Sequence, residues 1–191
     1  EISLGLVGSE MCIRDSAICT LANVNQGMFV YYFGFKEEYM KVLFQKIYED
    51  YLSKLQDYPE KDAKAAIQLQ QIFYRMTKYF IENFNTANFL TEALYHSKAA
   101  SYFTNYRVQH FIFVRTLIEQ AQREGDICSD MNSYEIYTTL HSILIQPIII
   151  KNNILQQHKN EPLMDKLKLI DVSSESSLQK RLRVAFKGLR P

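Results

Sequence analysis

The sequence predicts an all-α protein, because apolar residues recur at helical spacing and residues that break helices are scarce. Of its 191 residues, 47% are hydrophobic, and only 6 are glycine and 4 are proline. Glycine and proline punctuate structure, so this scarcity fits long helices with short connections. The length suits one compact protein or a small head on a larger body. We therefore expect an antiparallel helical bundle.

Composition limits the class of protein and its compartment. The formal net charge is +1, so the chain is not a strongly basic protein that coats DNA. Any DNA affinity has to come from a local basic patch. The cysteines Cys12, Cys19 and Cys128 are odd in number and lack metal-ligand spacing, which indicates a reducing cytoplasm. The longest strongly apolar stretch, 143–150, is far shorter than the ~20 residues of a membrane span. We expect a cytoplasmic protein without a membrane segment.

Residues 1–16 do not fit the helical pattern of the rest of the chain. They show no helix-period apolar spacing, and Gly5 and Gly8 interrupt any candidate helix. The stretch also resembles translated sequencing-adapter or vector sequence. We interpret residues 1–16 as a non-native segment that takes no part in the fold, and we place the start of the native fold near Ala17.

The first element that we expect is a short helix of about two turns over Gln26–Phe33. Asn25 is a good N-cap, because its side-chain oxygen can accept from backbone N–H groups two or three residues on. Phe29 and Phe33 lie four apart, so both rings can anchor one face to a core. Gly34 fits the position that ends the helix. Four side chains are left on the other faces: Gln26, Met28, Tyr31 and Tyr32.

Several helices follow this short one. Apolar residues recur at i, i+3 and i+4 from Met40 to Leu55, and Tyr58-Pro59 ends that helix, because the residue before a proline leaves helical geometry. A long helix is expected over 62–84, a shorter one over 89–99 and another long one over 105–124. The inward stripe expected for the last of these is Val108, Phe111, Ile112, Ile118 and Ala121.

The carboxyl-terminal elements have clear boundary residues. Gly125 ends the preceding helix, and Asn132 with Glu135 forms a capping-box pair that opens the next one. Pro147 is expected to kink that helix. After a polar stretch with one short amphipathic piece, a last helix is expected over 176–189.

The segment from Ala22 to Glu38 resembles a known DNA-binding motif. It reads Ala-Asn-Val-Asn-Gln-Gly-Met-Phe-Val-Tyr-Tyr-Phe-Gly-Phe-Lys-Glu-Glu. It is similar to the second half of the helix-turn-helix in the TetR/AcrR family of bacterial transcriptional repressors, approximately Ala-Gly-Val-Ser-x-Gly-Thr-Leu-Tyr-Tyr-His-Phe-x-Ser-Lys-Glu-Glu-Leu. The positions kept in register are Ala22, Val24, Gly27, Tyr31, Phe33, Gly34, Lys36, Glu37 and Glu38. The resemblance implies a helix-turn-helix head on an antiparallel helical bundle of the TetR type.

The resemblance also implies which residues meet double-stranded operator DNA. It makes the segment at about 25–33 the recognition helix in the major groove. Gln26 and Met28 would face base edges, while Tyr31 and Lys36 would donate to phosphate oxygens. The alternative is a short capped turn between two core helices. The residues expected at the DNA are Asn25, Gln26, Gly27, Met28, Tyr31, Tyr32 and Lys36.

The head is expected to be truncated. A complete domain of this family has a first helix and most of a second one before the turn, whereas 21 residues precede Ala22 here. We therefore expect residues 17–45 to form a truncated helix-turn-helix domain. Without a first helix, Leu21, Phe29 and Phe33 would lose burial worth about 1.5–3 kcal/mol each. We accordingly expect this chain to bind operator DNA poorly.

Residues 46–191 are expected to form the ligand-binding and dimerisation domain, since the family places both roles there. An aromatic-lined pocket suits a small hydrophobic or aromatic ligand. A homodimer interface is expected through about 134–153 and 176–189. The apolar excess over 143–150 favours a dimer over the alternative that these stripes are ordinary monomer core. The expected pocket residues, each with core packing as the alternative, are Phe73, Phe80, Phe84, Tyr95, Phe103 and Phe111.

We expect no metal, no cofactor and no enzymatic activity. Glu92 and His96 lie four apart and could share a metal, but one pair is too few ligands. The leading hypothesis is a cytoplasmic, dimeric, ligand-responsive transcriptional regulator, a repressor as is usual in the family. One alternative is a helical small-molecule-binding or dimerisation module without DNA binding. Another is a small helical enzyme that uses Glu92, His96 or His110.

Overall fold

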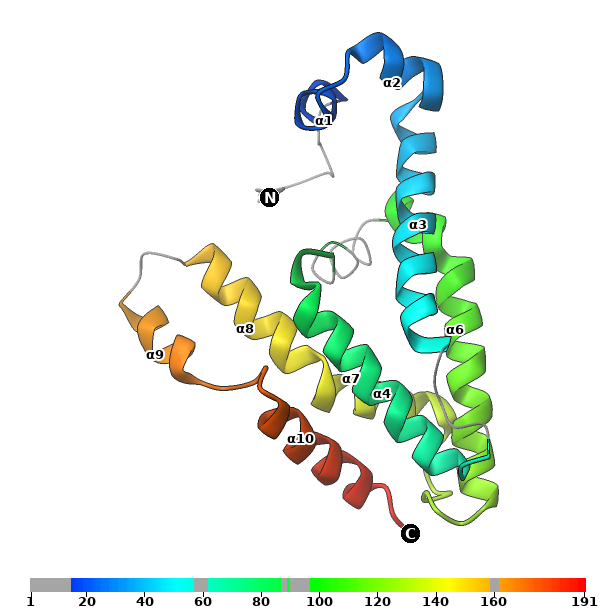
Figure 1. Cartoon of the computed structure of the whole chain (residues 1–191). Coiled ribbons are helices and arrows are strands. Elements are labelled where there is room, and N and C mark those ends of the chain that lie inside the picture. The colour runs from blue at the N-terminus through cyan, green and yellow to red at the C-terminus, as the bar shows by residue number, and fades with distance from the viewer. Residues whose placement is uncertain (1–14, 57–61, 87–88, 90–96, 159–161) are drawn as a thin grey trace.

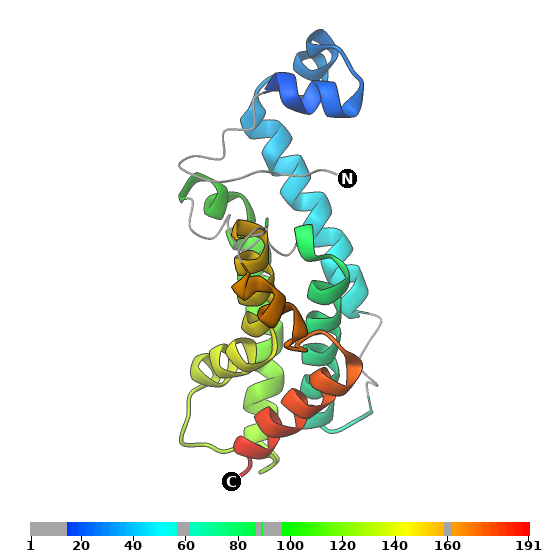
Figure 2. The ribbon, with the colours of Figure 1, turned by 90° about the vertical axis from the view of Figure 1, so that its left-hand side faces the viewer.

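The computed structural model describes residues 15–56, 62–86, 89, 97–158 and 162–191 (Figure 1). Every regular element among these residues is an α-helix, so the expected all-α class is confirmed. A small head stands at one end of a longer helical body (Figures 1 and 2). Within the described part of the chain, no helix combines the length and the apolarity that crossing a bilayer requires.

The head consists of α1 (Asp15–Ala22), α2 (Gln26–Phe33) and the beginning of α3 (Lys36–Gln56). α3 continues out of the head and packs against α4 and α6 of the body. Its apolar stripe from Met40 to Leu55 faces inward, as the spacing predicts. Head and body therefore share one continuous helix, and a division between residues 45 and 46 falls inside it.

The body contains α4 (Ala65–Glu82), α6 (Ser97–Arg123), α7 (Ser133–Leu144), α8 (Gln146–Gln157), α9 (Leu163–Leu169) and α10 (Glu175–Gly188). α4 is central and packs against α3, α6, α7 and α10. Fully buried side chains from these helices form the core, among them Phe44, Leu69, Phe73, Ile118, Ile136 and Leu140.

Two expectations for α6 are wrong. The helix begins at Ser97 rather than near residue 105. Its expected inward stripe is also wrong in part, because Val108 and Ile112 are about half exposed, whereas Ile118 and Ala121 are buried as expected. Among the α6 side chains that the structure describes, the buried face follows the spacing i, i+4, i+7, i+8 and i+11, and its first member is a histidine instead of an aliphatic residue. Its members are His110, Val114, Leu117, Ile118 and Ala121.

The kink expected at Pro147 is a complete break. α7 ends at Leu144 and α8 begins at Gln146, with the buried Ile145 between them. Proline lacks the N–H that a helix interior needs, but the N–H groups of the first turn have no partner within the helix. Starting a new helix immediately before Pro147 therefore removes the conflict that a continuous helix would create.

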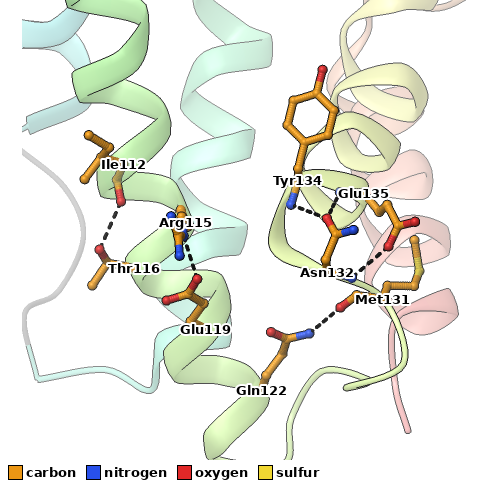
Figure 3. A network of polar contacts seen from close by, with 9 residues as sticks. All are labelled: Ile112, Arg115, Thr116, Glu119, Gln122, Met131, Asn132, Tyr134 and Glu135. Atoms are coloured by element: carbon orange, nitrogen blue, oxygen red, sulfur yellow. Dashed lines mark hydrogen bonds and ion pairs between the residues drawn. The ribbon is translucent and has the colours of Figure 1, made fainter.

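The connection from α6 to α7 is fixed by polar contacts (Figure 3). The side-chain amide of Gln122 donates to the carbonyl oxygens of Cys128 and Met131, each at 2.8 Å. Asn132 accepts from the backbone N–H of Glu135 at 3.0 Å, and the Glu135 carboxylate accepts from the Asn132 N–H at 2.8 Å. The capping box expected from the sequence is thus confirmed.

Arg181 of α10 joins the end of α7 to the segment before α10. Its Nη1 donates to the carbonyl oxygen of Leu144 at 2.6 Å, and its Nη2 donates to that of Val172 at 2.5 Å. We expect Arg181→Met to lower the free energy of unfolding by about 2 kcal/mol, because two partly buried carbonyls lose charged donors. Denaturant unfolding followed by circular dichroism measures this loss. The exposed Arg183→Met variant is the control, and an equal loss in both variants would contradict the role of Arg181.

Candidate nucleic-acid interface and aromatic interior

The turn between α1 and α2 has the local structure that the sequence predicts. Asn23 adopts a positive φ of 53°, which asparagine tolerates better than most residues. The side chain of Asn25 then caps α2, since its Oδ1 accepts from the backbone N–H of Met28 at 2.8 Å. Gly34 follows α2 with a φ of 65°, a conformation that favours glycine. The predicted cap and the predicted helix end are both confirmed.

Phe29 anchors α2 to the rest of the head. It is 4% exposed, and its ring lies 5.4 Å from the rings of both Phe33 and Tyr39, measured between centroids. Phe33 and Tyr39 also meet at 5.1 Å. The expectation that Phe29 loses its burial is therefore wrong, because the start of α3 packs on it. Leu21 is 62% exposed, in line with the expectation for that residue.

The side chains expected to face DNA lie on the outside of the head. Tyr31 is 83% exposed and Tyr32 is 68% exposed, and their rings meet edge to face at 5.2 Å. Gln26 and Met28 are exposed as well. A short helix with one buried aromatic anchor therefore offers amide, thioether and phenol groups to a partner. These are groups that can contact base edges and phosphates.

Gly27 and Lys36 have particular environments in the head. A Cβ on Gly27 would lie 3.2 Å from Oδ1 of Asn25, so the glycine leaves room for the cap as well as for a close partner. Lys36 is half-buried at the first residue of α3. Glu37 and Glu38 occupy the first turn of α3, where carboxylates favour the positive end of the helix dipole.

Four of the six expected pocket residues can be placed. Phe73 and Phe80 of α4 are buried, while Phe84 and Phe111 are half-buried. Tyr95 lies outside the described residues, as does the side chain of Phe103. Glu92 and His96, the pair considered for a metal, also lie outside them. Among the residues that the structure does describe, no three His, Cys, Asp or Glu side chains are grouped to hold a metal ion.

The structure adds residues to this aromatic group that the sequence did not single out. Tyr137 of α7 lies 6.0 Å from Phe73 and 5.3 Å from Phe111, measured between ring centroids. Tyr51 of α3 lies 6.2 Å from Phe80. The signal for Tyr51 was its place in the inward stripe of α3. The signal for Tyr137 was its position next to the buried Ile136.

Polar side chains lie among these aromatic rings. The hydroxyl of Tyr79 donates to Asp50 at 3.2 Å. Burial is the larger cause, and the Asp50 carboxylate the smaller one, that raises the pKa of Tyr79 to about 12. Burial raises the pKa of Tyr51 well above its ordinary value, and Tyr137 adds to the effect. Burial lowers the pKa of His110 to about 4, with a smaller contribution from His141. At neutral pH the side chains of Tyr51, Tyr79 and His110 are uncharged, which suits a neutral ligand.

The surfaces expected at a dimer interface are less apolar than the sequence indicates. Ile145, Ile148 and Ile149 are buried within the monomer, so the apolar excess over 143–150 mostly serves its own core. Apolar groups that do remain exposed on these helices include Tyr134 of α7, Ile150 of α8 and Val184 of α10.

Together these elements define a helix-turn-helix head on an antiparallel helical body, the fold of TetR-type regulators. The structure of the ketosteroid transcriptional regulator KstR2 of Mycobacterium tuberculosis is similar, with a TM-score of 0.61. The match covers 92% of this chain and 83% of that chain, at 16% sequence identity. The predicted fold is thereby confirmed. No family model and no curated protein matches the sequence.

Proposed function

We propose that this chain is a DNA-binding transcriptional regulator of the TetR type that acts as a repressor. The observation that carries the proposal is the arrangement of α2. Its amino end is capped by Asn25, and one face is held down by Phe29, while Gln26, Tyr31 and Tyr32 point outward. A short rigid helix at the tip of a protein is suited to entering the major groove.

Each outward group has a distinct task in this proposal. Gln26 reads a base edge, and an adenine is the base that glutamine pairs with bidentately. Met28 contacts a thymine methyl group. The hydroxyl of Tyr31 and the ammonium of Lys36 donate to phosphate oxygens, which position the helix without reading sequence. Asn25, Gly27 and Tyr32 complete the proposed interface.

Selection of binding sequences from random duplex DNA, followed by gel shift, tests this function. We expect Gln26→Ala to relax specificity at one base pair by about 1–3 kcal/mol. We expect Tyr31→Phe to weaken binding to all sequences by about threefold to tenfold, because one hydrogen bond to a phosphate is lost. Because Phe29 is buried in this head, we expect selective binding in place of the poor binding expected of a truncated head. Failure to select any sequence would contradict the proposal. It would favour a helical ligand-binding or dimerisation module, the role left if the head is unable to bind DNA.

The ligand response is proposed to pass along α3, between a head at 17–45 and a body at 46–191. Tyr39 of α3 packs on Phe29 in the head, and Tyr51 of the same helix packs on Phe80 in the body. Tyr39 and Tyr51 are 12 positions apart, which corresponds to about 18 Å of helix. A small hydrophobic or aromatic ligand that moved Tyr51 would also move the start of α3, on which α2 packs. Such a ligand shifts the equilibrium only if it binds the non-binding conformation more tightly.

A homodimer is proposed through about 134–153 and 176–189. Val184 supports it, because this side chain on α10 is 66% exposed although its helix packs closely on α4 and α7. We expect Val184→Glu to weaken the dimer by at least tenfold, since facing carboxylates across a twofold axis repel each other. Sedimentation equilibrium measures the dissociation constant. Val108→Glu, at a half-exposed site on α6 outside the proposed interface, is the control, and an equal effect of both would contradict this interface.

A further inference from the structure

His110 is a buried polar side chain on the inner face of α6. It is 7% exposed, and it occupies the same stripe as Val114, Leu117 and Ile118. Its Nε2 is buried and has no hydrogen-bonding partner among the residues that the structure describes. A buried imidazole nitrogen without a partner is costly, and native proteins almost always supply one. The described residues do not supply this partner, and a bound ligand is one source of it.

The ring of Tyr51 contacts His110, and further aromatic side chains of α4 and α7 lie one contact away. The ring of Tyr51 from α3 lies 5.8 Å from that of His110, and Tyr51 in turn contacts Phe80 of α4. His141 of α7 is close enough to affect His110 electrostatically, and its ring lies 6.2 Å from that of Tyr137. The ring packed on the imidazole is therefore flat and apolar, which favours an apolar and aromatic partner.

The chemistry of the imidazole further restricts the chemical class of the partner. A neutral histidine offers one donor nitrogen and one acceptor nitrogen, and a hydroxyl group can satisfy either. A ligand carboxylate buried beside His110 would require a positive charge next to it. Burial opposes the protonation of His110 that would supply this charge. A neutral molecule with one hydroxyl group on an apolar frame therefore fits both the nitrogen and its surroundings.

We propose that His110 Nε2 is the anchor for the hydroxyl group of a neutral, largely apolar ligand that lies among Tyr51, Phe80 and Tyr137. The proposal rests on the ligand-responsive function proposed above and names the chemical class of that ligand. The same site places the ligand against Tyr51, so its occupation acts directly on α3.

Three probes with one shared frame test the anchor: 2-naphthol, naphthalene and 2-naphthoate. Their affinities for the full chain are measured by calorimetry at pH 7 without DNA. We expect 2-naphthol to bind about tenfold more tightly than naphthalene, as one well-placed buried hydrogen bond allows. In His110→Phe this preference should disappear, while the control His158→Phe at an exposed position should keep it. In the wild-type protein, the side-chain ¹⁵N signal of His110 Nε2 should shift with 2-naphthol and not with naphthalene.

Four results would overturn the anchor. They are equal binding of naphthol and naphthalene, a naphthol preference that survives in His110→Phe, tighter binding of naphthoate, and no saturable binding of any probe. If His110→Phe does not fold, the ¹⁵N measurement on the wild-type protein tests the contact between 2-naphthol and His110. Because these assays contain no DNA, they separate the two proposals: a naphthol contact at His110 with no DNA selection would retain the anchor and reject the regulator.

Discussion

Replacing Phe29 with alanine is expected to unfold the head while the body stays folded. Phe29 is the one side chain of α2 that is buried, and its contacts are the rings of Phe33 and Tyr39. Removing a buried phenyl ring costs about 3–5 kcal/mol in protein cores. Within the described part of the chain, α1 packs mainly on α2, so α1 loses its support when α2 does. We expect this loss of stability to make the head open locally and to abolish any DNA binding.

Hydrogen exchange followed by mass spectrometry measures this effect segment by segment. Amides of α1 and α2 should exchange much faster in Phe29→Ala, while those of α4 and α7 should keep their protection. Val30→Ala is the matched control, because Val30 is the neighbouring residue and is exposed, so a change below about 0.5 kcal/mol is expected. Equal protection of the head in Phe29→Ala and wild type would show that Phe29 is not its anchor. A loss of protection across the whole chain would show that head and body unfold as one unit.

The local structure of the head and of the loops could be predicted because single residues determine it. Asn25 caps α2 through its own side chain, and Asn132 with Glu135 forms a box within four residues. Gly34 and Gly125 both take the positive φ that their positions require. Such features depend on neighbours in sequence, and a sequence contains those neighbours.

The parts that could not be predicted depend on packing between distant segments. The register of α6 was misjudged because Val108 and Ile112 are apolar, yet the helix turns them outward and buries His110 instead. Spacing alone would have allowed this face, since His110 and Ile118 lie eight apart, but a histidine was not counted as an inward residue. The role of Tyr39 in burying Phe29 depends on the angle between α2 and α3. The sequence does not encode that angle in a readable pattern.

The burial of His110 is expected to make the stability of the body depend on pH. The folded-state pKa of His110 is about 4, below the ordinary value of 6.5, because burial disfavours the charged imidazole and His141 adds to this. Between these two values the unfolded chain binds a proton that the folded chain does not. Stability therefore falls as pH decreases from 6.5 towards 4, and above 6.5 the contribution of His110 is fully present.

The shift corresponds to about 3 kcal/mol of unfolding free energy over this window, at roughly 1.4 kcal/mol for each pKa unit. Denaturant unfolding of wild type and His110→Phe at several pH values between 4 and 7.5 measures it. The difference in slope between the two proteins isolates His110, because the carboxylates that titrate in this range are common to both. His158→Phe, at an exposed position, should retain the wild-type slope. Parallel pH profiles for wild type and His110→Phe would show that the pKa of the imidazole is the same in the folded and the unfolded chain, and hence that burial does not penalise its charged form. In that case the interior would not disfavour charge at His110, and the preference of the site for a neutral ligand would lose its support.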